Sequence, residues 1–148
     1  MYTFQSLRKH LQTMTLSFRI HTNLDLVYDY LTDMQKFVTV HPVIYKMNKT
    51  TPDTYLVHET LKAGFISFSF TYPATIEKNE DDKSVIIRAI VFKLTKINMK
   101  FTLTADNEHT IINEQILFKT ILPVKGIMKN IFKTQHQKLF ENIELMGK

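Results

Sequence analysis

Three side chains in predicted strands have the chemistry for acid–base work. His58 and Glu59 are neighbours in a strand predicted over residues 54–62, and Glu114 lies in a strand predicted over 109–120. Successive side chains of a strand point to opposite faces, so His58 and Glu59 cannot pair with each other. Each could still be the acid–base group of a cyclase, dehydratase or hydrolase if it faces a pocket, because proton transfer requires contact with the reacting group.

Other catalytic patterns are missing from the sequence. The chain has no cysteine, which excludes a thiol nucleophile, and only three glycines, which exclude a P-loop or a dinucleotide-binding loop. The six histidines lack the spacing of metal ligands, and no G-x-S-x-G motif is present. His41 precedes Pro42 and is expected to mark the end of a helix. We therefore expect neither a metal nor a cofactor.

A larger group of residues is suited to lining an apolar pocket. Apolar side chains alternate with polar ones in the predicted strands, and apolar residues form one stripe of the predicted last helix. The candidate ligand-binding residues are Phe68, Phe70, Arg88, Met99, Phe101, Phe132, Gln135 and Leu139. Apolar stripes of this kind more often fill a solid core. The sequence leaves both interpretations open.

Two of these candidates are polar. Gln135 lies in the apolar stripe of the last helix, where a buried amide needs a hydrogen-bond partner in the protein or in a ligand. Arg88 stands alone in the apolar segment 85–91. If it is buried it needs a carboxylate, which Glu59, Glu114 or a ligand could supply. Otherwise Arg88 points to solvent from an exposed face of the sheet.

The order of the predicted elements sets where these residues lie. Alternating apolar residues predict a first strand over 13–20. Asn23 is predicted to cap a helix over 24–31, and Thr32 and Gln35 have the spacing of a capping box for a second short helix. Further strands are predicted over 43–49, 54–62, 65–78, 84–92, 96–104 and 109–120, followed by a helix from Pro123 to Met146.

The turns between these strands are short, which favours a mainly antiparallel sheet. The last helix must bury its apolar stripe against that sheet. The stripe consists of Met128, Ile131, Phe132, Gln135, Leu139, Ile143 and Met146. We expect an α+β fold of one domain over residues 1–148, with a curved sheet of about seven strands wrapped around the long C-terminal helix.

Three segments carry a resemblance to a known group of proteins. They are the helical segment 25–33 (DLVYDYLTD), the connection 37–42 (FVTVHP) and the helix start 123–132 (PVKGIMKNIF). In these the chain resembles the SRPBCC (START-like, helix-grip) superfamily, which includes polyketide cyclase-like proteins, over about residues 13–146. The resemblance implies a deep cavity between the sheet and the long helix. Members bind lipids, sterols, quinones or polyketides, some are enzymes, and no catalytic residue is common to all.

The charge distribution bears on possible partners. The net charge is +5, and the excess of lysine lies toward the C-terminal end. Lys125, Lys129 and Lys133 recur every four residues and could either meet anionic lipid headgroups or form a solvated helix face. No nucleic-acid-binding motif accompanies the charge, so we expect no nucleic acid as a partner.

The first residues lack a secretory h-region, and no apolar run reaches the ~20 residues of a membrane span. The expected location is the cytoplasm.

Together these features predict non-catalytic binding or transport of a hydrophobic small molecule or lipid, held between the sheet and the C-terminal helix. Two alternatives stay open. One is an acid–base enzyme of the cyclase, dehydratase or hydrolase type. The other, implied by the resemblance, is a protein-interaction module such as a chaperone co-activator or an accessory subunit. The sequence does not indicate the oligomeric state.

Overall fold

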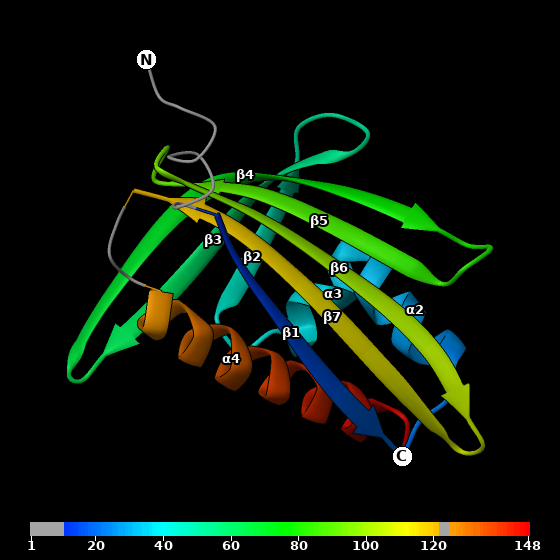
Figure 1. Ribbon diagram of the computed structural model, residues 1–148. Helices are drawn as coiled ribbons and strands as arrows, with labels where there is room; N and C mark the ends of the chain where they lie inside the picture. The colour runs from blue at the N-terminus through cyan, green and yellow to red at the C-terminus, as the bar shows by residue number, and fades with distance from the viewer. Residues whose placement is uncertain (1–10, 122–124) are drawn as a thin grey trace.

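The computed structural model describes residues 11–121 and 125–148, so the predicted helix start at Pro123 lies outside the described residues. The elements follow the predicted order (Figure 1). They are β1 (Leu11–Ile20), α2 (Leu24–Thr32), α3 (Met34–Val40), β2 (Ile44–Lys49), β3 (Thr54–Ala63), β4 (Ile66–Asn79), β5 (Ser84–Val91), β6 (Thr95–Asp106), β7 (His109–Thr120) and α4 (Lys125–Met146). Every predicted strand is present, with ends that differ by one or two residues at most.

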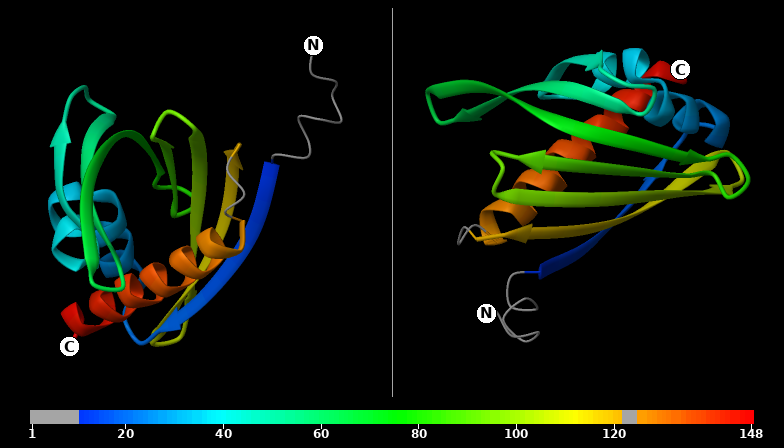
Figure 2. Two further views of the ribbon diagram at one scale, coloured as in Figure 1. Left: turned by 90° about the vertical axis from the view of Figure 1, so that its left-hand side faces the viewer. Right: turned by 90° about the horizontal axis from the view of Figure 1, so that it is seen from above.

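The strands form a single antiparallel sheet in the order β1-β7-β6-β5-β4-β3-β2. Consecutive strands from β2 to β7 are neighbours because short turns join them, and β1 pairs with β7 at the far edge. The sheet curves around α4, which crosses its concave face diagonally (Figure 2). The predicted fold class, a curved sheet that wraps around one long helix, is confirmed.

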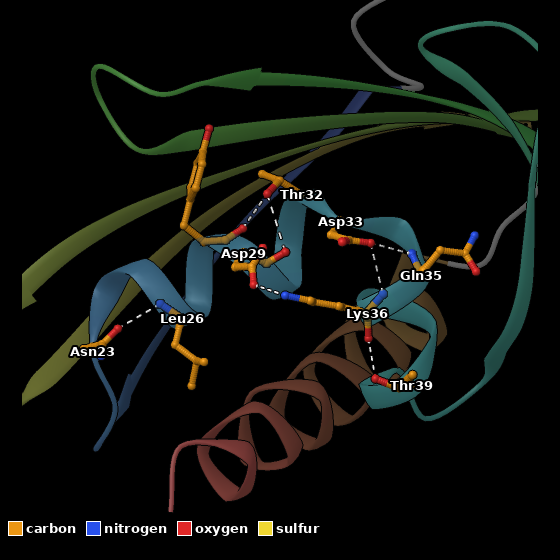
Figure 3. Close-up of polar contacts among 9 residues, drawn as sticks. Asn23, Leu26, Asp29, Thr32, Asp33, Gln35, Lys36 and Thr39 are labelled. Carbon is orange, nitrogen blue, oxygen red and sulfur yellow. Dashed lines mark hydrogen bonds and ion pairs between the residues drawn. The ribbon is translucent and has the colours of Figure 1, made fainter.

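The short helices α2 and α3 cover one end of the concave face. In each helix, the side chain of the residue just before it accepts hydrogen bonds from amides of the first turn (Figure 3). The predicted cap of α2 is confirmed, since Asn23 Oδ1 accepts a hydrogen bond from the Leu26 amide at 2.8 Å. The predicted capping box of α3 is wrong. Asp33 Oδ1 accepts from the amides of Gln35 and Lys36 at 3.0 and 3.3 Å, while the Thr32 hydroxyl donates to the preceding helix. A carboxylate one residue later competes successfully for the free amides of the first turn.

The buried stripe of α4 differs in part from the predicted one. Phe132, Leu139 and Ile143 are buried as predicted, whereas Gln135 is only half-buried and Met146 is half exposed. The stripe also includes His136 and Phe140, which are 4% and 1% exposed. The helix is therefore rotated toward these two residues. Sequence periodicity alone placed Gln135 at the centre of the stripe, because a histidine reads as polar in such a pattern.

The two ends of the concave face are packed differently. At the end covered by α2 and α3, the core is dense, and Val27, Leu31 and Phe37 are at most 5% exposed. At the other end lie the β3–β4 hairpin, the β5–β6 turn and the first turns of α4 (Figures 1 and 2). Large apolar side chains are exposed there: Phe65, Ile66, Phe68, Phe92, Leu94, Ile121 and Ile127. We call this end of the molecule, where these seven residues are exposed, the mouth end.

Gly147 follows α4 directly, at a point where the end of the helix packs closely against the start of α2. A Cβ at Gly147 would lie 2.1 Å from Thr22 Oγ1 and 3.2 Å from Leu26 Cδ2. We expect Gly147→Ala to lower the free energy of unfolding by about 1–3 kcal/mol, because the added methyl group overpacks this contact. Gly126→Ala is the matched control, since no atom lies within 4 Å of its Cβ position. Urea unfolding measures both, and equal stabilities of the two variants would contradict the contact.

Candidate functional site

A cavity of about 250 Å³ lies between the concave face of the sheet and the first half of α4. Its wall is mostly apolar and consists of Ile44, Leu61, Phe70, Ala89, Val91, Phe92, Ile97, Met99, Ile127, Met128, Ile131 and Phe132. The polar residues of the wall are His41, Glu59, Tyr72, Thr95, Gln135 and His136. A smaller inner pocket of about 40 Å³ shares part of this wall and extends toward α3. Strands with inward apolar rows and one helix that covers them only in part create this space.

Most of the candidate ligand-binding residues lie around this space. Phe70, Met99, Phe132 and Gln135 line the cavity. Phe101 and Leu139 line the inner pocket, where both are fully buried. Their contact with a ligand stays a prediction, but their position is that of a cavity wall.

Two candidates lie elsewhere. Phe68 does not line the cavity: it is 43% exposed, stacks on Phe70 at 5.7 Å and borders an open groove beside the start of α4. Arg88 lies on the convex face of the sheet, where its Nη1 atom is 2.9 Å from Glu77 Oε2. Its predicted role as a ligand anchor is therefore wrong, and neither Glu59 nor Glu114 is its partner. Strand alternation turns the neighbours of Arg88 inward and Arg88 outward.

The same alternation separates His58 from Glu59. His58 points away from the cavity and lies 3.3 Å from Asn48 Nδ2, beside the ring of Tyr45. Glu59 points into the cavity, where its Oε2 atom accepts a hydrogen bond of 2.6 Å from the Tyr72 hydroxyl. Burial raises the pKa of Glu59, an effect that the Tyr72 hydrogen bond and the charge of His136 oppose. Burial likewise raises the pKa of Tyr72 well above its ordinary value, helped by Glu59.

Glu114 forms a buried pair with His136 across the gap between β7 and α4. The Nδ1 atom of His136 lies 2.8 Å from Oε2 and 2.6 Å from Oε1 of Glu114. The two side chains are 5% and 0% exposed. The carboxyl group and the imidazole share a proton across this contact, which gives each buried side chain a hydrogen-bond partner. The rings of Phe101 and Phe132 flank the imidazole, with centroids 5.8 and 5.6 Å from it.

His136 was not among the residues predicted from the sequence, although the sequence contains a signal for it. Glu114 occupies an inward row of β7 with Ile112, Ile116 and Phe118, all of which are buried. A carboxylate in such a row needs a buried partner. The partner could not be named from the sequence, because the rotation of α4 decides which helix residue faces β7.

His41 combines a structural and a cavity-facing role. As expected it ends α3, and its Nδ1 atom accepts hydrogen bonds from the amides of Val43 and Ile44 at 3.2 and 3.0 Å. Both bonds require an unprotonated Nδ1, so the neutral ring carries its proton on Nε2. Burial lowers the pKa of His41 to about 3, and the charge of His136 contributes to this shift. The ring lines the cavity as a neutral donor.

The wall therefore brings together hydrogen-bonding groups from the end of α3 and from β3, β4, β6 and α4 among mostly apolar residues. Within the described chain, no arginine or lysine is among the residues that line the cavity. Among residues 11–121 and 125–148, no three His, Asp or Glu side chains are placed to hold a metal ion. This arrangement can bury an apolar molecule and form hydrogen bonds to a polar group on it.

The low pKa of His41 has a consequence for stability. Between about pH 6.5 and pH 3 the unfolded chain binds a proton at His41 that the folded chain does not. Its contribution is complete above pH 6.5 and is lost as the pH falls, by up to about 1.4 kcal/mol per pH unit. We expect His41→Gln to flatten this part of the stability curve. Urea unfolding at several pH values measures it, and an NMR titration that shows the folded His41 ring protonated at about pH 5 would contradict it.

Solved structures with the same fold share little sequence with this chain. The crystal structure of Ara h 8.0201 has a TM-score of 0.74 at 14% identity, over 90% of this chain and 95% of that one. A START superfamily protein from Mycobacterium smegmatis has a TM-score of 0.74 at 10% identity, over 91% and 96%. The Zhui aromatase/cyclase from Streptomyces sp. R1128 has a TM-score of 0.70 at 11% identity, over 93% and 94%. These similarities show the helix-grip fold and nothing of the activity.

The sequence comparisons are more specific. No curated protein matches the chain. The family model for CoxG, a carbon monoxide dehydrogenase subunit, matches residues 17–143, which include every strand but the start of β1, both short helices and nearly all of α4. The fold agrees with the superfamily that the sequence resembles. The chain belongs to the CoxG family of carbon monoxide dehydrogenase subunits.

Proposed function

We propose that this protein binds an apolar or amphipathic small molecule, such as a lipid, in the cavity between the sheet and α4, without chemical change to it. The apolar wall of the cavity carries the proposal. An apolar cavity of about 150 Å³ is large enough to bind benzene, so about 250 Å³ accommodates a larger ligand. Each buried methylene group contributes about 0.8 kcal/mol before the costs of binding are subtracted.

The charge distribution supports a membrane as the place where this ligand is exchanged. Segments 60–72, 89–105 and 115–140 contain no Asp or Glu, and all seven apolar residues of the mouth end belong to these segments. Lysines accompany the exposed apolar side chains there: Lys62, Lys93, Lys96 and Lys119 are exposed and Lys129 is half-buried. The acidic residues of α2, of the β4–β5 turn and of the β6–β7 turn lie at the opposite end (Figure 1).

We therefore propose that the mouth end contacts anionic lipid surfaces. Exposed apolar side chains enter the boundary of a bilayer, and each nearby lysine adds electrostatic attraction to anionic headgroups. Of the basic row expected on the last helix, Lys133 is exposed and Lys129 is half-buried, and the side chain of Lys125 lies outside the described residues. No described helix is long and apolar enough to cross a bilayer.

Filling the cavity tests the first proposal. Ala89 points into the cavity from β5, so we expect Ala89→Phe to weaken binding of the uncharged probe N-phenyl-1-naphthylamine about tenfold or more, measured by fluorescence titration. Ala105→Phe places the same ring at an exposed position of β6 and should bind the probe like the wild type. Thermal unfolding confirms that both variants fold. Absence of probe binding to the wild type, or equal binding to both variants, would refute the proposal.

Vesicle flotation tests the second proposal. We expect the protein to float with vesicles that contain phosphatidylglycerol and not with pure phosphatidylcholine, and to dissociate as salt screens the lysines. Charge reversal by Lys93→Glu, next to exposed Phe92 and Leu94, should weaken flotation several-fold. Lys78→Glu, near the opposite end of β4, is the matched control and should not. Equal losses for the two variants would contradict a membrane contact at the mouth end.

One observation favours the acid–base enzyme as a second candidate function. Glu59 faces the cavity and burial raises its pKa, which is the environment that acid catalysts occupy. The hydrogen bond from Tyr72 orients its carboxyl group. A ligand recovered from Glu59→Gln protein in a different chemical form from that recovered from the wild type would favour turnover over binding.

A further inference from the structure

The cavity has a polar wall that the apolar proposal leaves unexplained. We use this name for His41, Glu59 and His136, which come from the end of α3, from β3 and from α4 and all line the cavity. Ile44 pairs with Glu59 across β2 and β3, and the Ile44 amide donates a hydrogen bond of 3.0 Å to His41 Nδ1, so His41 and Glu59 are neighbours in the wall. His136 faces them from α4. The three groups therefore form one region of the wall, and their hydrogen-bonding atoms define what a ligand can place there.

His41 supplies a donor to this region. Its Nδ1 atom is occupied by the amides of Val43 and Ile44, so the proton of the neutral ring is on Nε2. Within the described residues, Nε2 has no hydrogen-bond partner. A ligand oxygen that accepts a hydrogen bond would satisfy this donor.

Glu59 supplies an acceptor. Its Oε2 atom already accepts a hydrogen bond from Tyr72 at 2.6 Å, whereas Oε1 receives none from the part of the chain that the structure describes. A ligand group that donates a hydrogen bond would satisfy Oε1. A hydroxyl group both donates and accepts, so it matches Glu59 and His41 together.

Across residues 11–121 and 125–148, no positive charge in this region is available to a ligand anion. The only charged donor among the described lining residues is His136 when protonated, and its Nδ1 atom is paired with the buried carboxylate of Glu114. A ligand carboxylate would therefore lie near the carboxyl group of Glu59, and the one imidazole that could compensate it is already paired with Glu114. Burial of a like charge without a partner is strongly unfavourable in an apolar cavity.

We propose that the polar wall binds an uncharged, hydroxyl-bearing head group of the cavity ligand and excludes fatty-acid carboxylates. The hydroxyl group donates a hydrogen bond to Glu59 and accepts one from His41, while the apolar part of the ligand fills the rest of the cavity. This inference rests on the proposed ligand binding and names the chemical class of the ligand.

Three ligands with the same alkyl chain test the proposal. 1-Decanol, decanoate and decylamine compete with N-phenyl-1-naphthylamine for the wild-type protein at about pH 7, below their micelle concentrations. We expect 1-decanol to bind about tenfold more tightly than decanoate and more tightly than decylamine. Equal or tighter binding of decanoate or decylamine would overturn the proposal while the naphthylamine signal still supports an apolar cavity. Absence of naphthylamine binding would instead refute the proposed function, and this inference with it.

A substitution then assigns the selectivity to the polar wall. Glu59→Gln keeps the shape of the side chain and removes its charge, so we expect the preference for 1-decanol over decanoate to fall at least about threefold. The preference is the ratio of two affinities measured on the same variant, so a change in naphthylamine binding does not enter it. Glu77→Gln removes a carboxylate from the convex face and should leave the preference unchanged. An unchanged preference in Glu59→Gln, or an equal change in Glu77→Gln, would overturn the role of Glu59.

Discussion

The structure depends on a mismatch of area between one helix and the sheet that wraps around it. Seven strands present a concave apolar face, and α4 is too narrow to cover all of it. The short helices α2 and α3 complete the core at one end, where Leu31, Leu139 and Ile143 are fully buried. At the other end nothing in the described chain fills the space, so inward side chains such as Met99 and Phe132 become the walls of a cavity. Core and cavity are therefore parts of one apolar layer.

Polar groups in such a layer need partners, and the way they are paired determines the chemistry of the cavity. Glu114 and His136 satisfy each other across the β7–α4 contact, which ties the helix to the sheet at a fixed rotation. Tyr72 satisfies one oxygen of Glu59, and backbone amides satisfy one nitrogen of His41. Glu59 and His41 each keep a second polar atom for the cavity. A buried charge without any hydrogen-bond partner would cost too much free energy of folding. A side chain with one polar atom hydrogen-bonded and the other free is less costly, and its free atom can bind a ligand.

The same geometry separates the surface into two ends with different charge and exposed apolar area. The end with α2 and α3 is closed, acidic and well packed, while the mouth end exposes seven large apolar side chains among lysines. Side chains such as Phe65, which is fully exposed, contribute nothing to the core. Their position next to the cavity connects the apolar interior with an apolar surface, as exchange of a ligand with a lipid phase requires.

Much of the fold could be predicted from local sequence, and much less of the site. Strand alternation and turn residues determined the order of elements, the antiparallel sheet and the inward direction of Phe70 and Met99, because these depend only on neighbours in the chain. Alternation also separated His58 from Glu59. It could not say which face of β5 is inward, and for this reason Arg88 stood among the candidates although it lies outside.

Only the tertiary structure decided the pairings between distant elements. The rotation of α4 brings His136, and not Gln135, to Glu114, and the curvature of the sheet brings the end of α3 close enough for His41 to reach the cavity. Both depend on how whole elements pack, which no periodicity of one segment records. The sequence by itself determined the apolar faces that must be buried. Packing decided how much of them a single helix covers, and thus where a cavity is left and which polar groups line it.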